Sequence, residues 1–161
     1  MKLIIPYRLK SSRFPNKYIS DFLGLPLIEH SLKLCEEFGN DVNISLYKSV
    51  DKFLNQAKQN PPDLVGLAVY YWNNALNEYV VKCLREMFGK KVVIVLGGPS
   101  IDSDKKEKNN FLTKKFPKAD AIVVNEGELG FGFITKKMLS DQKNLFKDPI
   151  NGVSFIYNNE L

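Results

Sequence analysis

The stretch Asp63–Ser100, DLVGLAVYYWNNALNEYVVKCLREMFGKKVVIVLGGPS, decides the fold. Its first part, 63–71, is nearly all apolar, which is typical of a strand covered on both faces. Residues 74–88 place apolar side chains at helical spacing and are followed by glycine, so they predict an amphipathic helix. A second apolar run, 91–96, leads into a Gly-Gly-Pro turn. Strand, helix and strand in this order predict a parallel βαβ unit with a right-handed crossover.

The same alternation continues on both sides of this unit. Further strands are predicted at 2–6, 42–47 and 119–124, and further helices at 26–38, 49–58, 105–116 and 130–139. The tail, 152–161, alternates before a pair of asparagines and predicts a β-hairpin. We therefore expect one α/β domain over residues 1–161. Its expected core is an open, mainly parallel, five-stranded Rossmann-like sheet with helices on both faces and a C-terminal hairpin.

Composition narrows the class of protein. The chain has 161 residues, of which 44% are apolar, and its net charge is +5. These values fit a globular protein, which we expect in the cytoplasm, and the modest charge does not indicate a nucleic-acid partner. We expect no membrane partner, because no apolar run approaches the roughly 18 residues of a membrane span. Two cysteines, Cys35 and Cys83, are too few for a disulfide framework or a four-thiolate metal site, so we expect buried, reduced thiols.

The loops that follow the strands are the expected ligand site, because open α/β sheets bind ligands beyond the carboxyl ends of their strands. Tyr70, Tyr71 and Trp72 follow one strand and offer flat apolar surface, and Asn73 offers an amide. Core packing and a helix cap are the alternative for these residues. After the next strand, the glycines of 97–98 allow close approach of a ligand, or form an ordinary turn. A bulky residue at Gly98 is expected to block such a ligand and to leave the fold intact.

The loop after the first strand is basic. It contains Arg8, Arg13 and Lys17 among hydroxyl side chains such as Ser11. Guanidinium and ammonium groups at a strand end suit a triphosphate, and a solvent-exposed basic loop is the alternative.

Residues 3–32, which include IPYRLKSSRFPNKYISDFLGLPLIEHSL, resemble the opening of the cytidylyltransferases that make CMP-Kdo and CMP-sialic acid. The resemblance implies a nucleotidyltransferase-like first unit over 1–40, in which Arg8, Ser11, Arg13 and Lys17 hold the phosphates of CTP with Mg²⁺. Two features depart from the family. Tyr7 replaces a small residue, and the nearest analogue of the acidic metal site, 125–128, lacks the aspartate.

The stretch from about residue 43 to 161 resembles the cobalamin-binding domain of radical SAM enzymes. The similarity follows PPDLVGLAVYYWNN, VVIVLGGPS, AIVVNEGELG and INGVSFIY in that order. It implies contacts to the cofactor from the loops after three strands, by Tyr70, Tyr71, Trp72, Asn73, Gly97, Gly98, Pro99, Ser100, Glu126, Gly127 and Glu128.

Two motifs that such enzymes use are absent from the sequence. The cobalt-ligating D-x-H-x-x-G is missing, and His30, the chain's one histidine, lies in the predicted helix 26–38. The cluster motif C-x-x-x-C-x-x-C is missing too, so we expect no iron–sulfur cluster, no metal site and no catalytic residue in this chain.

The sequence therefore predicts a cobalamin-type cofactor module that works with a radical SAM barrel in cis or in trans and is not catalytic by itself. The alternatives are a CTP-binding protein that activates an acidic sugar, and a degenerate Rossmann-like interaction module.

Overall fold

The protein is described by a computed structural model that covers residues 1–161. The description that follows concerns residues 2–6, 21–22, 25–26, 41–47, 49–124 and 127–156. Among these residues, no helix combines the length and the apolar character that crossing a membrane would need.

The described part of the chain builds a mixed sheet of six strands in the order β4-β1-β5-β6-β7-β8. Their bounds are β1 Lys2–Pro6, β4 Asn43–Tyr47, β5 Leu64–Ala68, β6 Val93–Gly97, β7 Ala121–Val123 and β8 Val153–Phe155. All neighbouring pairs are parallel except β7 and β8, which are antiparallel. A separate antiparallel pair is formed by β2, Asp21–Phe22, and β3, Leu25–Pro26.

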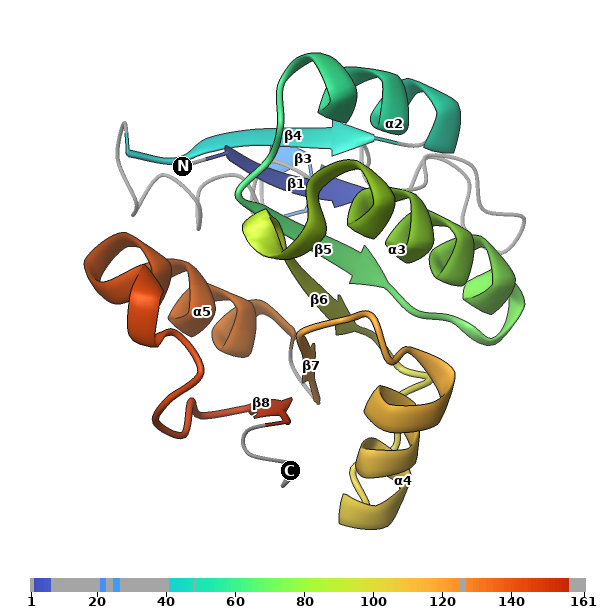
Figure 1. Ribbon diagram of the computed structural model, residues 1–161, viewed down its shortest axis with the longest axis vertical. Coiled ribbons are helices and arrows are strands. Elements are labelled where there is room, and N and C mark those ends of the chain that lie inside the picture. The colour runs from blue at the N-terminus through green and yellow to red at the C-terminus, as the bar shows by residue number, and fades with distance from the viewer. Residues whose placement is uncertain are drawn as a thin grey trace.

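The order of the strands locates a switch point beside β5. The chain places β4 on one side of β1 and then β5 on the other side, so the direction of the strand order reverses between β1 and β5. The arrowheads of β4, β1 and β5 point the same way in Figure 1, which puts their carboxyl ends at one edge. Ligands of doubly wound sheets bind at such a point.

Helices pack against both faces of the sheet (Figure 1). The α-helices of the described residues are α2 Val50–Gln59, α3 Asn74–Phe88, α4 Lys105–Asn110 and α5 Gly127–Asp141. One core cluster joins the sheet to α2, α3 and the π-helical turn Phe111–Lys115 that continues α4. The other joins the opposite face to α5 and the segment that follows it.

The alternation of strand side chains explains the two cores. Val65 and Leu67 of β5 belong to the α3 side, whereas Leu64 belongs to the α5 side. In β6, Ile94 and Leu96 face α3, and Val95 faces α5. These strands are apolar along their whole length because both of their faces are buried.

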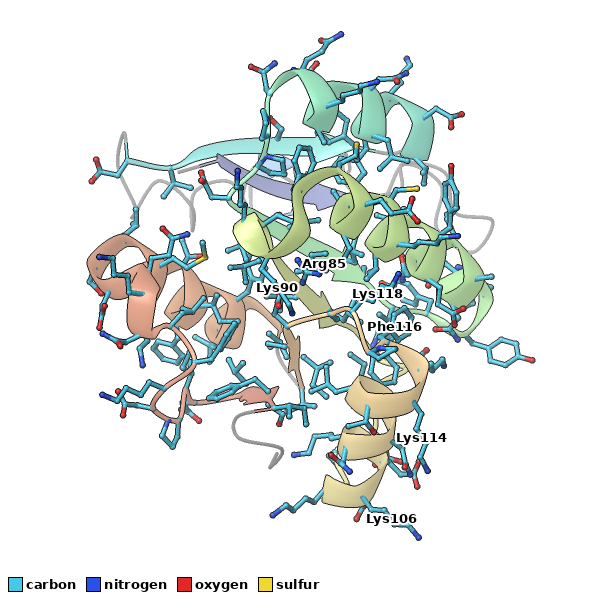
Figure 2. The ribbon with its side chains drawn as sticks, viewed as in Figure 1. Arg85, Lys90, Lys106, Lys114, Phe116 and Lys118 are labelled. Carbon is cyan, nitrogen blue, oxygen red and sulfur yellow. The ribbon has the colours of Figure 1, made fainter. Side chains whose placement is uncertain are left out.

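A buried ion pair ties α3 to the amino-terminal edge of the sheet. The side chains of Arg85 and Asp120 are 9% and 13% exposed and form a hydrogen-bonded salt bridge. Asp120 also accepts from the backbone N–H of Ile94 at 2.8 Å and from Lys90 Nζ at 3.0 Å. Figure 2 shows Arg85 and Lys90 together near the start of β6. Arg85 further donates, at 2.6 to 2.8 Å, to the backbone oxygens of Gly89, Val92 and Lys118.

The structure confirms the α/β fold and corrects several details. The expected count of five strands is not confirmed, because β8 extends the sheet beyond β7. The expected C-terminal hairpin is not confirmed either, since β8 pairs with β7 and residues 157–161 lie outside the described part. Most of the predicted helix 26–38 also lies outside it.

Candidate functional site

The loop after β5 exposes two large aromatic side chains at the switch point. Tyr71 is 86% exposed and Trp72 is 68% exposed, so core packing does not explain either residue. The rings of Tyr70 and Trp72 are stacked, with 4.9 Å between their centroids and 14° between their planes. The loop therefore presents a flat apolar surface that is already formed.

Amide side chains hold this loop in place. Asn73 Oδ1 accepts from the backbone N–H of Tyr70 at 2.8 Å, and Asn73 Nδ2 donates to the carbonyl oxygen of Ala68 at 2.8 Å. Asn77 is only 5% exposed, and its Nδ2 donates to the same carbonyl at 3.1 Å and to Asn73 Oδ1 at 3.3 Å. These bonds link the end of β5 to the first turns of α3.

These hydrogen bonds assign Asn73 a structural role in the loop in place of the predicted contact with a ligand. The sequence predicts that its amide faces a ligand, but the structure directs both polar ends of that amide to neighbouring protein atoms. Asn74, the first residue of α3, differs from Asn73. Its Nδ2 donates to the carbonyl oxygen of Tyr71 at 3.3 Å, while its Oδ1 is buried without a hydrogen-bond partner.

The loop after β6 runs close to the end of β5. Gly98 has φ +128°, which side chains other than glycine rarely adopt. A Cβ at Gly98 would lie 2.6 Å from the backbone oxygen of Val69, whereas one at Gly97 would meet Val123 at 3.7 Å or more. The glycine at 98 is therefore required by backbone packing. Pro99 and Ser100 follow and are exposed.

This geometry corrects an expectation about Gly98. A bulky residue at this position would overlap the Val69 backbone and disturb the loop itself, so it cannot report on a ligand alone. Gly97 has ordinary van der Waals room for a methyl group, so Gly97→Ala is the better substitution for adding bulk at the strand end.

The loop after β7 leads into α5. Gly127 begins this helix, and a Cβ there would meet nothing within 4 Å. Leu129 and Phe133, one turn apart, are 63% and 40% exposed. Glu126 and the side chain of Glu128 lie outside the described part.

Gly130 holds the first turns of α5 against the sheet. A Cβ at Gly130 would lie 2.6 Å from the Val123 side chain and 3.1 Å from the Gly152 carbonyl oxygen. Only a glycine allows the helix to begin so close to β7.

Several predicted residues fall outside the described chain. These are Arg8, Ser11, Arg13 and Lys17 of the basic loop, together with His30 and Cys35. Within the described residues, Cys83 is a free, partly buried cysteine, and no three His, Cys, Asp or Glu side chains are grouped as metal ligands.

One titratable group of α3 has a shifted pKa. Tyr79 lies on an exposed part of α3, and a hydrogen bond with the Cys83 side chain, together with repulsion from its thiolate form, raises the pKa of the Tyr79 hydroxyl. The neutral phenol is thus favoured on this helix surface.

The arrangement suits recognition of a large, flat ligand. It combines an apolar aromatic surface, a strand end with a glycine that tolerates close approach, and one unpaired amide oxygen. Polar groups that could hold a ligand's orientation are few, as is usual for cofactor sites.

Comparison with known proteins connects the chain to two groups. Residues 3–45 match the cytidylyltransferase family. A stretch of 93 residues, 58% of this chain, is 32% identical to the cobalamin-dependent radical SAM methyltransferase TokK of Streptomyces tokunonensis, of which it covers 13%. The predicted resemblance to both groups is confirmed.

A solved structure shares the fold. The apo form of the cobalamin-dependent S-adenosylmethionine radical enzyme OxsB matches 99% of this chain with a TM-score of 0.65 and 18% sequence identity. The match covers 21% of the OxsB chain. The chain therefore spans about a fifth or less of the length of these two relatives.

Proposed function

We propose that this chain is a cofactor-binding module that holds cobalamin at the carboxyl edge of its sheet for a radical SAM enzyme. The observation that carries the proposal is the exposed aromatic loop at the switch point, where Tyr71 and Trp72 offer apolar surface that the protein core does not use. A corrin ring is a large, flat ligand whose burial would cover this surface. The relatives named above are cobalamin-dependent radical SAM enzymes, which supports this choice of ligand.

The proposed contacts come from three loops. Tyr70, Tyr71 and Trp72 would supply the aromatic surface, and the sequence after β6 and β7 offers Gly97, Pro99, Ser100, Glu126, Gly127 and Glu128 as further contacts. Asn73 and Gly98 act indirectly, because they shape the loops after β5 and β6.

Cobalamin, when bound, supplies organocobalt chemistry that no side chain offers. The protein's part is to bind and orient the ring and to exclude water from the face that it covers. We further propose that no histidine of this chain ligates the cobalt, that the chain is not catalytic by itself, and that a radical SAM barrel acts with it in cis or in trans.

Uptake of the cofactor tests the proposal. Purified protein mixed with hydroxocobalamin should keep the colour through a desalting column and show a visible spectrum different from that of the free cofactor. Protein that leaves the column colourless would argue against a cobalamin module.

A second candidate function rests on the match of residues 3–45 to the cytidylyltransferase family. In this alternative, Arg8, Ser11, Arg13 and Lys17 bind the phosphates of CTP with Mg²⁺. The first strand of that match, β1, pairs with β5 in the sheet, so the basic loop would begin at the same edge as the aromatic loop.

Thermal shift with CTP distinguishes the alternative. If the basic loop binds CTP, ligand at about 100 times its dissociation constant should stabilise the fold by about 2.7 kcal/mol. The variant Arg13→Ala should lose that shift. We expect little or no shift for the wild type, because the acidic metal site of the family is incomplete in this sequence. A full shift that Arg13→Ala abolishes would favour the nucleotide over cobalamin.

A further inference from the structure

The side-chain oxygen of Asn74 is an unused acceptor at the candidate site. In the described part of the chain, Asn74 Oδ1 stands out as a buried side-chain atom without a hydrogen-bond partner. Its amide orientation is fixed, because Nδ2 donates to the carbonyl oxygen of Tyr71 at 3.3 Å. Turning the amide over would bring two oxygens together, so Oδ1 must face away from Tyr71.

Such an atom needs an explanation, because buried polar groups in proteins nearly always have partners. An unpaired buried acceptor loses its hydrogen bonds to water and lowers stability. The neighbouring amides show that the loop can satisfy its polar groups. Asn73 is bonded at both polar ends, and Asn77 Nδ2 donates to two acceptors. Asn74 is the exception within this cluster of three amides.

We propose that Asn74 Oδ1 accepts a hydrogen bond from a carboxamide N–H of the bound cofactor. The inference rests on the proposed function, since the rim of a cobalamin corrin carries carboxamide groups whose N–H donors match this acceptor. Asn74 directly follows the aromatic loop, so an amide on the rim of a ring lying against Trp72 would be close to it.

A ligand would reach this oxygen after a rotamer change of Tyr71, the exposed residue whose carbonyl oxygen Asn74 contacts. Tyr71 is 86% exposed and takes no part in the ring stacking of Tyr70 and Trp72. Exposed side chains change rotamer within nanoseconds. A cofactor that displaces the Tyr71 side chain and lies against Trp72 would gain apolar contact and also supply the missing donor. Asn74 would thereby select amide-bearing corrins over those without N–H donors.

The test is the variant Asn74→Leu, which keeps the approximate size of the side chain and removes its acceptor. The dissociation constant for hydroxocobalamin, measured by calorimetric titration, should rise about tenfold. Without ligand, the midpoint of urea unfolding should change little, because removal of an unpaired buried acceptor offsets the loss of the long, exposed hydrogen bond from Nδ2 to Tyr71. A residue that only supported the fold would lower that midpoint.

Two controls make the result specific. Asn74→Gln keeps both an amide oxygen that accepts and an amide N–H that can donate to the Tyr71 carbonyl, and it should bind within about threefold of the wild type. Cobyrinic acid heptamethyl ester, a corrin with esters in place of amides, should bind the wild type and Asn74→Leu equally.

The same measurements distinguish a failure of the proposed cobalamin binding from a failure of the role proposed for Asn74. A wild type that binds no hydroxocobalamin overturns the proposed function, and this inference with it. A wild type that binds, together with Asn74→Leu that binds equally well or unfolds at a lower urea concentration, overturns the role of Asn74 alone.

Discussion

Replacing Arg85 with alanine is expected to lower the free energy of unfolding by about 3–5 kcal/mol. The substitution removes the partner of Asp120, whose side chain is 13% exposed, and leaves a nearly buried carboxylate with less compensation. It also removes hydrogen bonds from the guanidinium to three backbone oxygens. The loss should appear in urea unfolding followed by circular dichroism, as a lower midpoint with the slope unchanged.

Lys90 provides the matched control, because it contacts the same carboxylate from solvent. Its side chain is 76% exposed, so Lys90→Ala should cost less than about 1 kcal/mol. Similar losses for Arg85→Ala and Lys90→Ala would show that the burial of Arg85 is not what stabilises this edge of the sheet.

Replacing Trp72 with alanine is expected to weaken hydroxocobalamin binding by about 30-fold, while the stability of the free protein changes little. The binding loss corresponds to about 2 kcal/mol, the usual scale for an aromatic side chain at the centre of a binding surface. The free protein should tolerate the change, because 68% of the Trp72 surface is already in water. Calorimetric titration and urea unfolding on the same preparations would measure both quantities.

Tyr79 supplies the control for this substitution. It is another exposed aromatic residue, 53% exposed, but it lies in the second turn of α3, beyond the loop that follows β5. Tyr79→Ala should therefore leave the dissociation constant within about twofold of the wild type. Equal weakening by both variants would indicate that cobalamin binds along the helix and not at the loop.

The strands and helices follow from local patterns, so much of the fold is predictable. The helix expected at 74–88 has the same bounds as α3, and the buried run 91–96 overlaps β6, Val93–Gly97. The pairing of β8 with β7 is different. It joins residues that are about thirty positions apart, and no local periodicity specifies a partner at that distance.

Helical spacing also leaves open which side of a helix is buried. Leu76 and Tyr79 fall on the apolar stripe predicted for α3, yet they are 48% and 53% exposed. Val80 and Leu84, which belong to the same predicted stripe, are buried, and the buried side also contains the polar Asn77. Hydrophobicity does not predict that an asparagine is buried. The burial of Asn77 depends on a hydrogen bond from its amide to the carbonyl oxygen of Ala68, which the sequence does not show.

The sequence indicates where a candidate site would lie, but not the arrangement of its side chains. The rule that ligands bind beyond strand ends selects the loops after β5 and β6. Sequence alone could not separate an exposed Trp72 from a buried one, or show that Gly98 is required by the backbone of Val69. No sequence pattern identified Asn74 as a candidate contact, because its unpaired oxygen is apparent only in the three-dimensional structure.

The most direct test of the central claim is where bound cobalamin protects the protein. Trp72, the chain's one tryptophan, can be followed by hydroxyl-radical footprinting and peptide mass spectrometry, with Tyr79 as an internal reference. Saturating hydroxocobalamin should slow the oxidation of Tyr71 and Trp72 several-fold relative to Tyr79. Oxidation of all three residues in the same ratio with and without bound cofactor would contradict a cobalamin site at the carboxyl edge of the sheet.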